Sequence, residues 1–141
     1  LLVSYGNEKI WDVLAKNPRN RVIVFGEQPE MLRFPCCTQS YTDIEGSGGN
    51  FNLSSSPEAL ADFFTFVEVD YIYLGSGYLK PGTDGFRNVT GLLKQGYLKD
   101  LLYENGNGLA VFSAEPKNLT GEESEALLAE FTEKYWPGEQ Q

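Results

Sequence analysis

Two short apolar runs stand out in the pattern of hydrophobic and polar positions. Residues 21–26 hold Val-Ile-Val-Phe closed by glycine, and residues 69–74 hold Val-Asp-Tyr-Ile-Tyr-Leu. Four β-branched or aromatic residues in a row are too few for a buried helix, and they are typical of a strand covered on both faces. The pattern therefore predicts two strands, the first of them central in a parallel sheet.

An amphipathic helix is predicted between these strands. Ser56-Pro57-Glu58 provides an N-cap, a proline at the first helical position and an acid in the first turn. Apolar residues then recur at helical spacing: Leu60, Phe63, Phe64 and Val67. We interpret the neighbouring aromatics of this helix and of residues 69–74 as core rather than as ligand-stacking groups. A strand, a helix and a second strand predict a parallel, right-handed crossover.

Weaker patterns complete the predicted elements. They are a helix over 7–17 that ends before Pro18, a helical turn over 28–32, a strand over 36–41, a helix from Phe86 that ends at Gly96, and a last helix that begins with a Thr120 to Glu123 capping box. Between 42 and 55 the sequence predicts a long irregular loop. Residues 137–141 are expected to be a frayed tail.

An antiparallel hairpin is predicted near the end of the chain. Residues 98–103 and 108–112 flank Asn105-Gly106, and both turn residues accept positive φ. We expect this hairpin at one edge of the sheet, with its exposed side near 109–112 and an acidic helix over it. The sequence thus predicts one α/β domain over 1–141: a three-layer, Rossmann-like α/β/α fold with a mainly parallel sheet.

Charge and composition narrow the function classes. With 20 acidic and 11 basic residues the net charge of the 141-residue chain is −9, so nucleic acid is not an expected partner. The chain has no histidine, which removes the usual general base and metal ligand. The adjacent Cys36 and Cys37 lack the spacing of a zinc site and are interpreted as buried thiols. No run of eighteen apolar residues is present.

Polar residues follow each predicted strand. In an open α/β sheet, ligands bind beyond the carboxyl ends of the strands, so we expect these residues to lie close together. The candidate ligand-binding residues are Glu27, Gln28, Asp43, Glu45, Ser47, Asn50, Ser76 and Tyr78.

The chemistry of these residues stays open at this point. The carboxylates could act as acid and base on a sugar, and the simpler interpretation is that they are solvated loop residues. The glycine-rich segment 46–50 lacks the spacing of phosphate-binding loops, and a Ca²⁺ site at Asp43, Glu45 and Asn50 lacks the EF-hand register. We assign no catalytic residue, no metal and no cofactor.

The order of these motifs resembles the soluble C-terminal domain of polytopic membrane glycosyltransferases. That group includes the dolichyl-phosphate-mannose protein mannosyltransferases and the aminoarabinose transferases, which use polyprenyl-phosphate sugars. Its "RVLVFG" strand, "YLxxxxIDYVLV" step and "YENGxxxLYRV" hairpin are similar to residues 21–26, 63–74 and 103–112. The similarity covers about ninety residues, all of structural type, so no catalytic residue of the family is carried over.

The resemblance implies a non-catalytic accessory domain on the extracytoplasmic face of a membrane. Its role would be acceptor or partner recognition, or packing over the membrane active site of its own parent chain, with a glycan or lipid-linked sugar nearby. The start at Leu1-Leu2-Val3 without methionine leads us to expect a piece of a longer protein. The alternative is a free-standing small-molecule-binding or carboxylate-based enzymatic domain with its site at the strand ends.

Overall fold

The computed structural model describes residues 8–25, 34–40, 56–75 and 81–135. The helices in these ranges are α1 (Glu8–Ala15), α5 (Pro57–Phe66), α6 (Asp84–Lys94) and α7 (Gly121–Tyr135). The strands are β1 (Arg21–Phe25), β2 (Cys37–Ser40), β3 (Tyr71–Leu74), β4 (Leu98–Glu104) and β5 (Asn107–Phe112). The predicted turn over 28–32, the loop over 42–55 and the tail over 137–141 lie outside the described residues.

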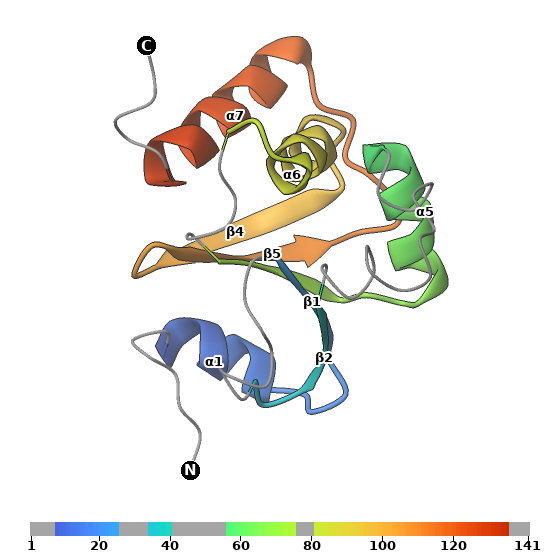
Figure 1. The fold of residues 1–141 in the computed structure, drawn as a ribbon, viewed down its shortest axis with the longest axis vertical. Helices are drawn as coiled ribbons and strands as arrows, with labels where there is room; N and C mark the ends of the chain where they lie inside the picture. The colour runs from blue at the N-terminus through green and yellow to red at the C-terminus, as the bar shows by residue number, and fades with distance from the viewer. Residues whose placement is uncertain (1–7, 26–33, 41–55, 76–80, 136–141) are drawn as a thin grey trace.

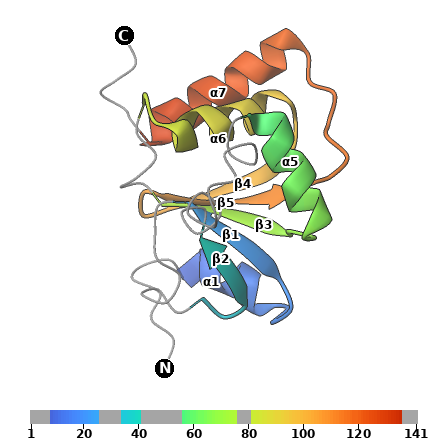
Figure 2. The same cartoon turned by 45° about the vertical axis from the view of Figure 1, so that its right-hand side comes forward.

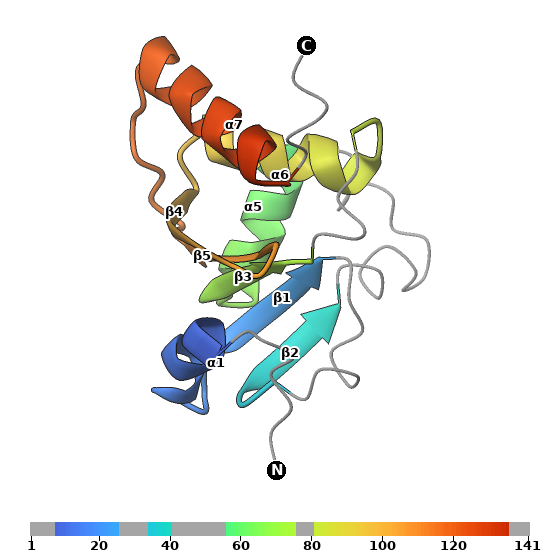
Figure 3. The same cartoon turned by 90° about the vertical axis from the view of Figure 1, so that its left-hand side faces the viewer.

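The strands form one mixed sheet in the order β2-β1-β3-β5-β4. β1 pairs in parallel with β2 and with β3, and Ile23 lies opposite Ile72. Figure 3 shows the arrows of β1 and β2 pointing the same way. The prediction that the two apolar runs lie side by side and run in the same direction is confirmed.

Helices cover both faces of this open sheet (Figures 1 and 2). α5, α6 and α7 lie on one face, where Phe64, Leu93 and Phe131 belong to the larger core cluster. α1 lies on the other face, where Ile10 and Leu14 are fully buried against β1, β3 and β5. The predicted mixed α/β class is therefore confirmed.

The predicted helix starts are present as capping hydrogen bonds. The Ser56 hydroxyl accepts from the N–H of Ala59 at 3.1 Å and so caps α5. At the start of α7, Glu123 N–H donates to the Thr120 hydroxyl and Thr120 N–H donates to the Glu123 carboxylate, both at 3.1 Å. These bonds satisfy N–H groups that have no partner within the helix, which fixes where each helix begins.

β3 is two residues shorter than predicted. Val69 belongs to the turn that ends α5, because its N–H donates to the Phe64 carbonyl at 2.9 Å and Glu68 adopts a φ of 57°. Asp70 follows, and its carboxylate accepts from Arg21 N–H at 2.9 Å. The apolar pattern could not separate Val69 from the strand, because Val69 is also buried.

The hairpin is confirmed, with one correction at its edge. Asn105 and Gly106 have φ values of 52° and 81° and form the two-residue turn between β4 and β5. However, β5 lies between β3 and β4, so the prediction of an exposed edge at 109–112 is wrong. β5 takes the inner position because Leu109, Ala110 and Phe112 are buried from both faces of the sheet. The outer strand of the hairpin is β4.

The interpretation of the aromatics as core is confirmed for the two most buried of them. Phe64 and Tyr73 are 0% and 1% exposed. Phe64 packs edge-on against Phe25, with ring centroids 6.4 Å apart. Phe63 and Tyr71 are half-buried at the margins of the two clusters. These rings therefore hold the helices on the sheet.

Glu104 joins the hairpin to α1. Its two carboxylate oxygens accept hydrogen bonds from Lys9 N–H and Ile10 N–H, each at 3.0 Å. The carboxylate thus caps the first turn of a helix that is 94 positions distant in the sequence.

Replacing this carboxylate should loosen α1 from the sheet. We expect Glu104→Ala to lower the free energy of unfolding in urea by about 1–2 kcal/mol, the usual cost of losing an N-terminal cap. Glu115→Ala is the matched control, because Glu115 is exposed and its carboxylate caps no helix. Equal stabilities of the two variants would contradict the capping role.

Candidate functional site

The parallel strands end together at one edge of the sheet. Val24 lies opposite Ser40, and Phe25 lies opposite Leu74, so β1, β2 and β3 finish at the same level. Gly75 N–H then donates to the Phe25 carbonyl at 2.9 Å and extends the ladder by one bond. We call this edge, formed by the ends of the three strands, the strand-end rim. It is the place where the sequence predicts a ligand site.

All eight predicted site residues lie outside the described part of the chain. They are Glu27, Gln28, Asp43, Glu45, Ser47, Asn50, Ser76 and Tyr78. The strands that carry them end side by side, as expected. Whether the eight side chains come together stays a prediction.

Two tyrosines from late in the chain approach the strand-end rim. The rings of Tyr103 and Tyr135 are 5.7 Å apart at an angle of 61°. The Tyr135 hydroxyl donates to the Leu74 carbonyl at 3.4 Å. This approach requires glycine at position 108, since a Cβ there would meet the Tyr135 hydroxyl. The sequence analysis did not predict this contact, for which Gly108 was the one available signal.

The electrostatics of this pair keep both hydroxyls protonated. Burial raises the pKa of Tyr103 above its ordinary value, and the negative charge of Glu130 raises it further by a smaller amount. Burial also raises the pKa of Tyr135. The Tyr103 hydroxyl has no hydrogen-bond partner among the described residues, and Lys134 Nζ lies 5.6 Å from the centre of its ring. At neutral pH the pair is uncharged, so it supplies no general base.

Removing the two hydroxyls should have opposite effects on stability. Tyr103→Phe removes a buried group without a partner and should raise the free energy of unfolding by about 1 kcal/mol. Tyr135→Phe removes the bond to Leu74 and should lower the free energy of unfolding by a similar amount. Urea titration of both variants beside the wild type measures the two differences.

The same tyrosines make stability depend on pH in the alkaline range. Because their pKa values are raised in the folded protein, the unfolded chain releases these protons first. The wild type should keep its full stability below about pH 10 and lose it as the pH rises further, and Tyr103→Phe should lose less. A larger alkaline loss in Tyr103→Phe than in the wild type would contradict the raised pKa.

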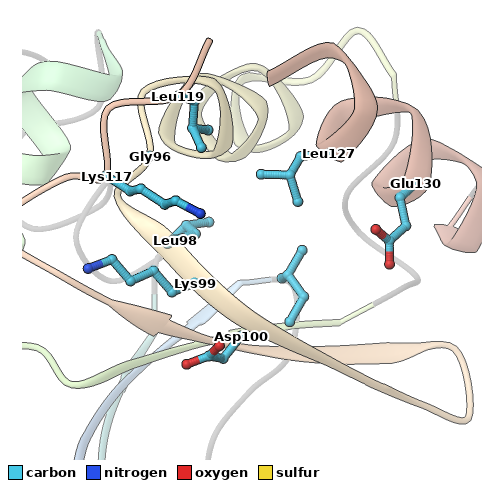
Figure 4. Close-up of a pocket in the computed structure, with 9 residues that line it drawn as sticks. Gly96, Leu98, Lys99, Asp100, Lys117, Leu119, Leu127 and Glu130 are labelled. Atoms are coloured by element: carbon cyan, nitrogen blue, oxygen red, sulfur yellow. The ribbon is translucent and has the colours of Figure 1, made fainter. Parts of the chain in front are cut away.

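A hollow of about 330 Å³ lies between β4, the segment before α7, and α7 itself (Figure 4). We call it the larger hollow, to distinguish it from a smaller hollow of about 150 Å³ that is described below. Sequence reasoning did not predict it. Its lining is apolar in the middle and charged at the margins: Leu98, Leu101, Leu119 and Leu127, with Gly96, Lys99, Asp100, Lys117 and Glu130. The volume is at the small end of the range for ligand pockets.

The strand that borders the larger hollow is irregular. The register of β4 against β5 shifts between Lys99 and Leu102, and Asp100 adopts a φ of 50°. Such a bulge kinks a strand and leaves an extra residue unpaired. Lys99 Nζ points away from the larger hollow and donates to the Ser113 hydroxyl at 3.2 Å. Lys117 and Glu130 therefore supply the charges that face each other across its length (Figure 4).

The described ranges hold neither a metal-binding group of side chains nor a membrane-spanning helix. No group of three or more Cys, Asp or Glu residues in the described ranges could hold a metal ion. Within the same ranges, no helix has the length and apolar character needed to cross a membrane. The larger hollow combines four leucines with charged side chains in its lining.

Comparison of the chain with known protein families, curated proteins and solved structures finds no match.

Proposed function

We propose that the chain is a non-catalytic accessory domain of a membrane-bound glycosyltransferase that uses a polyprenyl-phosphate sugar. In this proposal the domain lies on the extracytoplasmic face of the membrane. It recognises an acceptor or a protein partner, or packs over the active site in the membrane part of its own parent chain.

One observation carries the proposal. The three stretches that resemble that family, at 21–26, 63–74 and 103–112, supply strands that lie next to one another. β1 pairs with β3, and β3 pairs with β5 of the hairpin. Segments far apart in the sequence thus form the centre of one sheet. If the resemblance reflects a shared fold, the three stretches must lie together in this way.

The order β2-β1-β3 with α5 between β2 and β3 is the arrangement of a doubly wound α/β unit. With α1 on the opposite face from α5, α6 and α7, we propose a three-layer, Rossmann-like architecture that ends in an antiparallel hairpin.

The side chains favour recognition over catalysis. The whole chain lacks histidine, and the larger hollow is lined by leucines together with charged residues at its margins. Binding surfaces have an apolar centre and a polar rim of this kind. We therefore assign the domain a role in binding rather than in sugar transfer.

The reading frame that encodes the chain tests the assignment to a transferase. We expect about ten hydrophobic segments upstream, each long enough to span a bilayer at roughly 20 residues. In the full-length protein, we also expect sugar transfer to require carboxylates outside residues 1–141. A start codon close to Leu1 would contradict the proposal.

The strand-end rim favours a second candidate function. Because β1, β2 and β3 end at one level, the loops that follow them leave from a common edge, where α/β proteins bind small molecules. The second candidate is a free-standing domain that binds a small molecule there through residues such as Glu27, Asp43 and Tyr78.

A thermal-shift screen tests this candidate. Sugars, nucleotides, polyprenyl phosphates and Ca²⁺ would each be added to the purified chain. A ligand at a hundred times its dissociation constant should stabilise the fold by about 2.7 kcal/mol, and Asp43→Ala should reduce that shift. A shift that is unchanged in Asp43→Ala, or no shift with any compound, would count against the second candidate.

A further inference from the structure

β4 has a hydrogen-bonded neighbour on one side. It pairs with β5, and no described strand lies on its other side. Beyond the bulge at Asp100, the residues 101–104 therefore present backbone N–H and C=O groups along an open edge. An edge of this kind is a template for one more strand.

Side chains on the two faces of β4 border two different hollows. Leu101 packs toward the helices α6 and α7 and lines the larger hollow of about 330 Å³. Leu102 packs toward α1 and lines a smaller hollow of about 150 Å³. The remaining lining of the smaller hollow is Val13, Tyr71, Leu109 and Val111, with Asp100 at its margin. Both hollows thus open beside the same short stretch of edge.

A strand added to β4 would place side chains in both hollows. Successive residues of an extended chain point to opposite faces of a sheet, about 3.3 Å apart along the strand. Two neighbouring apolar residues would therefore enter the larger and the smaller hollow. The residue two positions after the one in the larger hollow would lie on the same face of the sheet, the face covered by α6 and α7, and would point toward Glu130.

A second copy of this chain fits the edge poorly. In an antiparallel pair of β4 strands that matches faces and is centred on Leu102, Leu101 of one copy lies opposite Tyr103 of the other. That register sets Asp100 of each copy opposite Glu104 of the other, and like charges directly opposite are destabilising. Each chain also carries a net charge of −9. A cationic segment of a different protein has the complementary charge.

We propose that the open edge of β4 binds an extended, cationic segment of another protein by strand addition. Its two apolar side chains occupy the hollows on opposite faces of the sheet, and a lysine or arginine reaches Glu130. The bulge at Asp100 and the acidic residues at the edge then exclude anionic strands and other copies of the chain. The inference deepens the proposed role in partner recognition and rests on it.

Peptide titration with NMR detection tests this binding mode on the intact chain. The probe is acetyl-Thr-Thr-Leu-Val-Lys-Thr-amide, in which leucine and lysine share one face and valine the other. We expect the amide signals of residues 101–104 to shift, with a dissociation constant of about 1 mM or tighter. A peptide with glutamate in place of lysine, and one with methylated backbone nitrogens, should bind at least about tenfold more weakly.

A charge-reversal variant tests the contact with Glu130. Glu130→Lys should weaken binding of the lysine peptide about fivefold, and Glu125→Lys should leave it unchanged. Glu125 is the matched control because it is exposed on the same helix and does not line the larger hollow. Spectra of both variants show whether the fold is retained.

The inference is overturned by any of three results: no shift at residues 101–104 at about 1 mM peptide, equal binding of the methylated peptide, or equal effects of the two variants. These results leave the reading-frame test untouched. Conversely, a reading frame without upstream hydrophobic segments would overturn the assignment to a transferase and not the strand addition.

Discussion

The parallel pairing of β1 with β3 is the interaction on which the rest of the structure depends. The two strands have Ile23 opposite Ile72 and Phe25 opposite Leu74, and they bury apolar side chains on both faces. On one face these side chains hold α5, α6 and α7, and on the other they hold α1. The same pairing brings the strand ends to one level and leaves the free side of β3 for the hairpin. Both proposed binding regions follow from it.

The sequence predicted the elements whose causes are local. The Ser56 cap, the Thr120–Glu123 capping box and the Asn105-Gly106 turn each depend on residues within four positions, and all three are present. The parallel centre could also be predicted, because a helix between two buried strands leaves little choice of topology. The start of β3 was predicted at Val69, two residues before its position at Tyr71, since burial alone does not distinguish a turn from a strand.

The features that escaped prediction depend on contacts between distant segments. An Asn-Gly turn indicates that two strands pair, but does not indicate which of them joins β3, so the edge was assigned to β5 instead of β4. The larger hollow arises where a bulge in β4 meets α7, about thirty positions away, and no periodicity signals that meeting. Sequence reasoning placed the candidate site entirely in residues 27–28, 43–50 and 76–78, all outside the described part of the chain. The described hollows lie instead along the hairpin.

Cross-strand nuclear Overhauser effects in the isotope-labelled chain test the central pairing most directly. The account predicts contacts between backbone protons of Val22 and Tyr71, and of Val24 and Tyr73, in the staggered pattern of parallel strands. Close contacts between the Hα protons of residues 21–25 and 71–74 in reversed order would show antiparallel strands. That result would contradict the shared strand-end rim and the resemblance built on it.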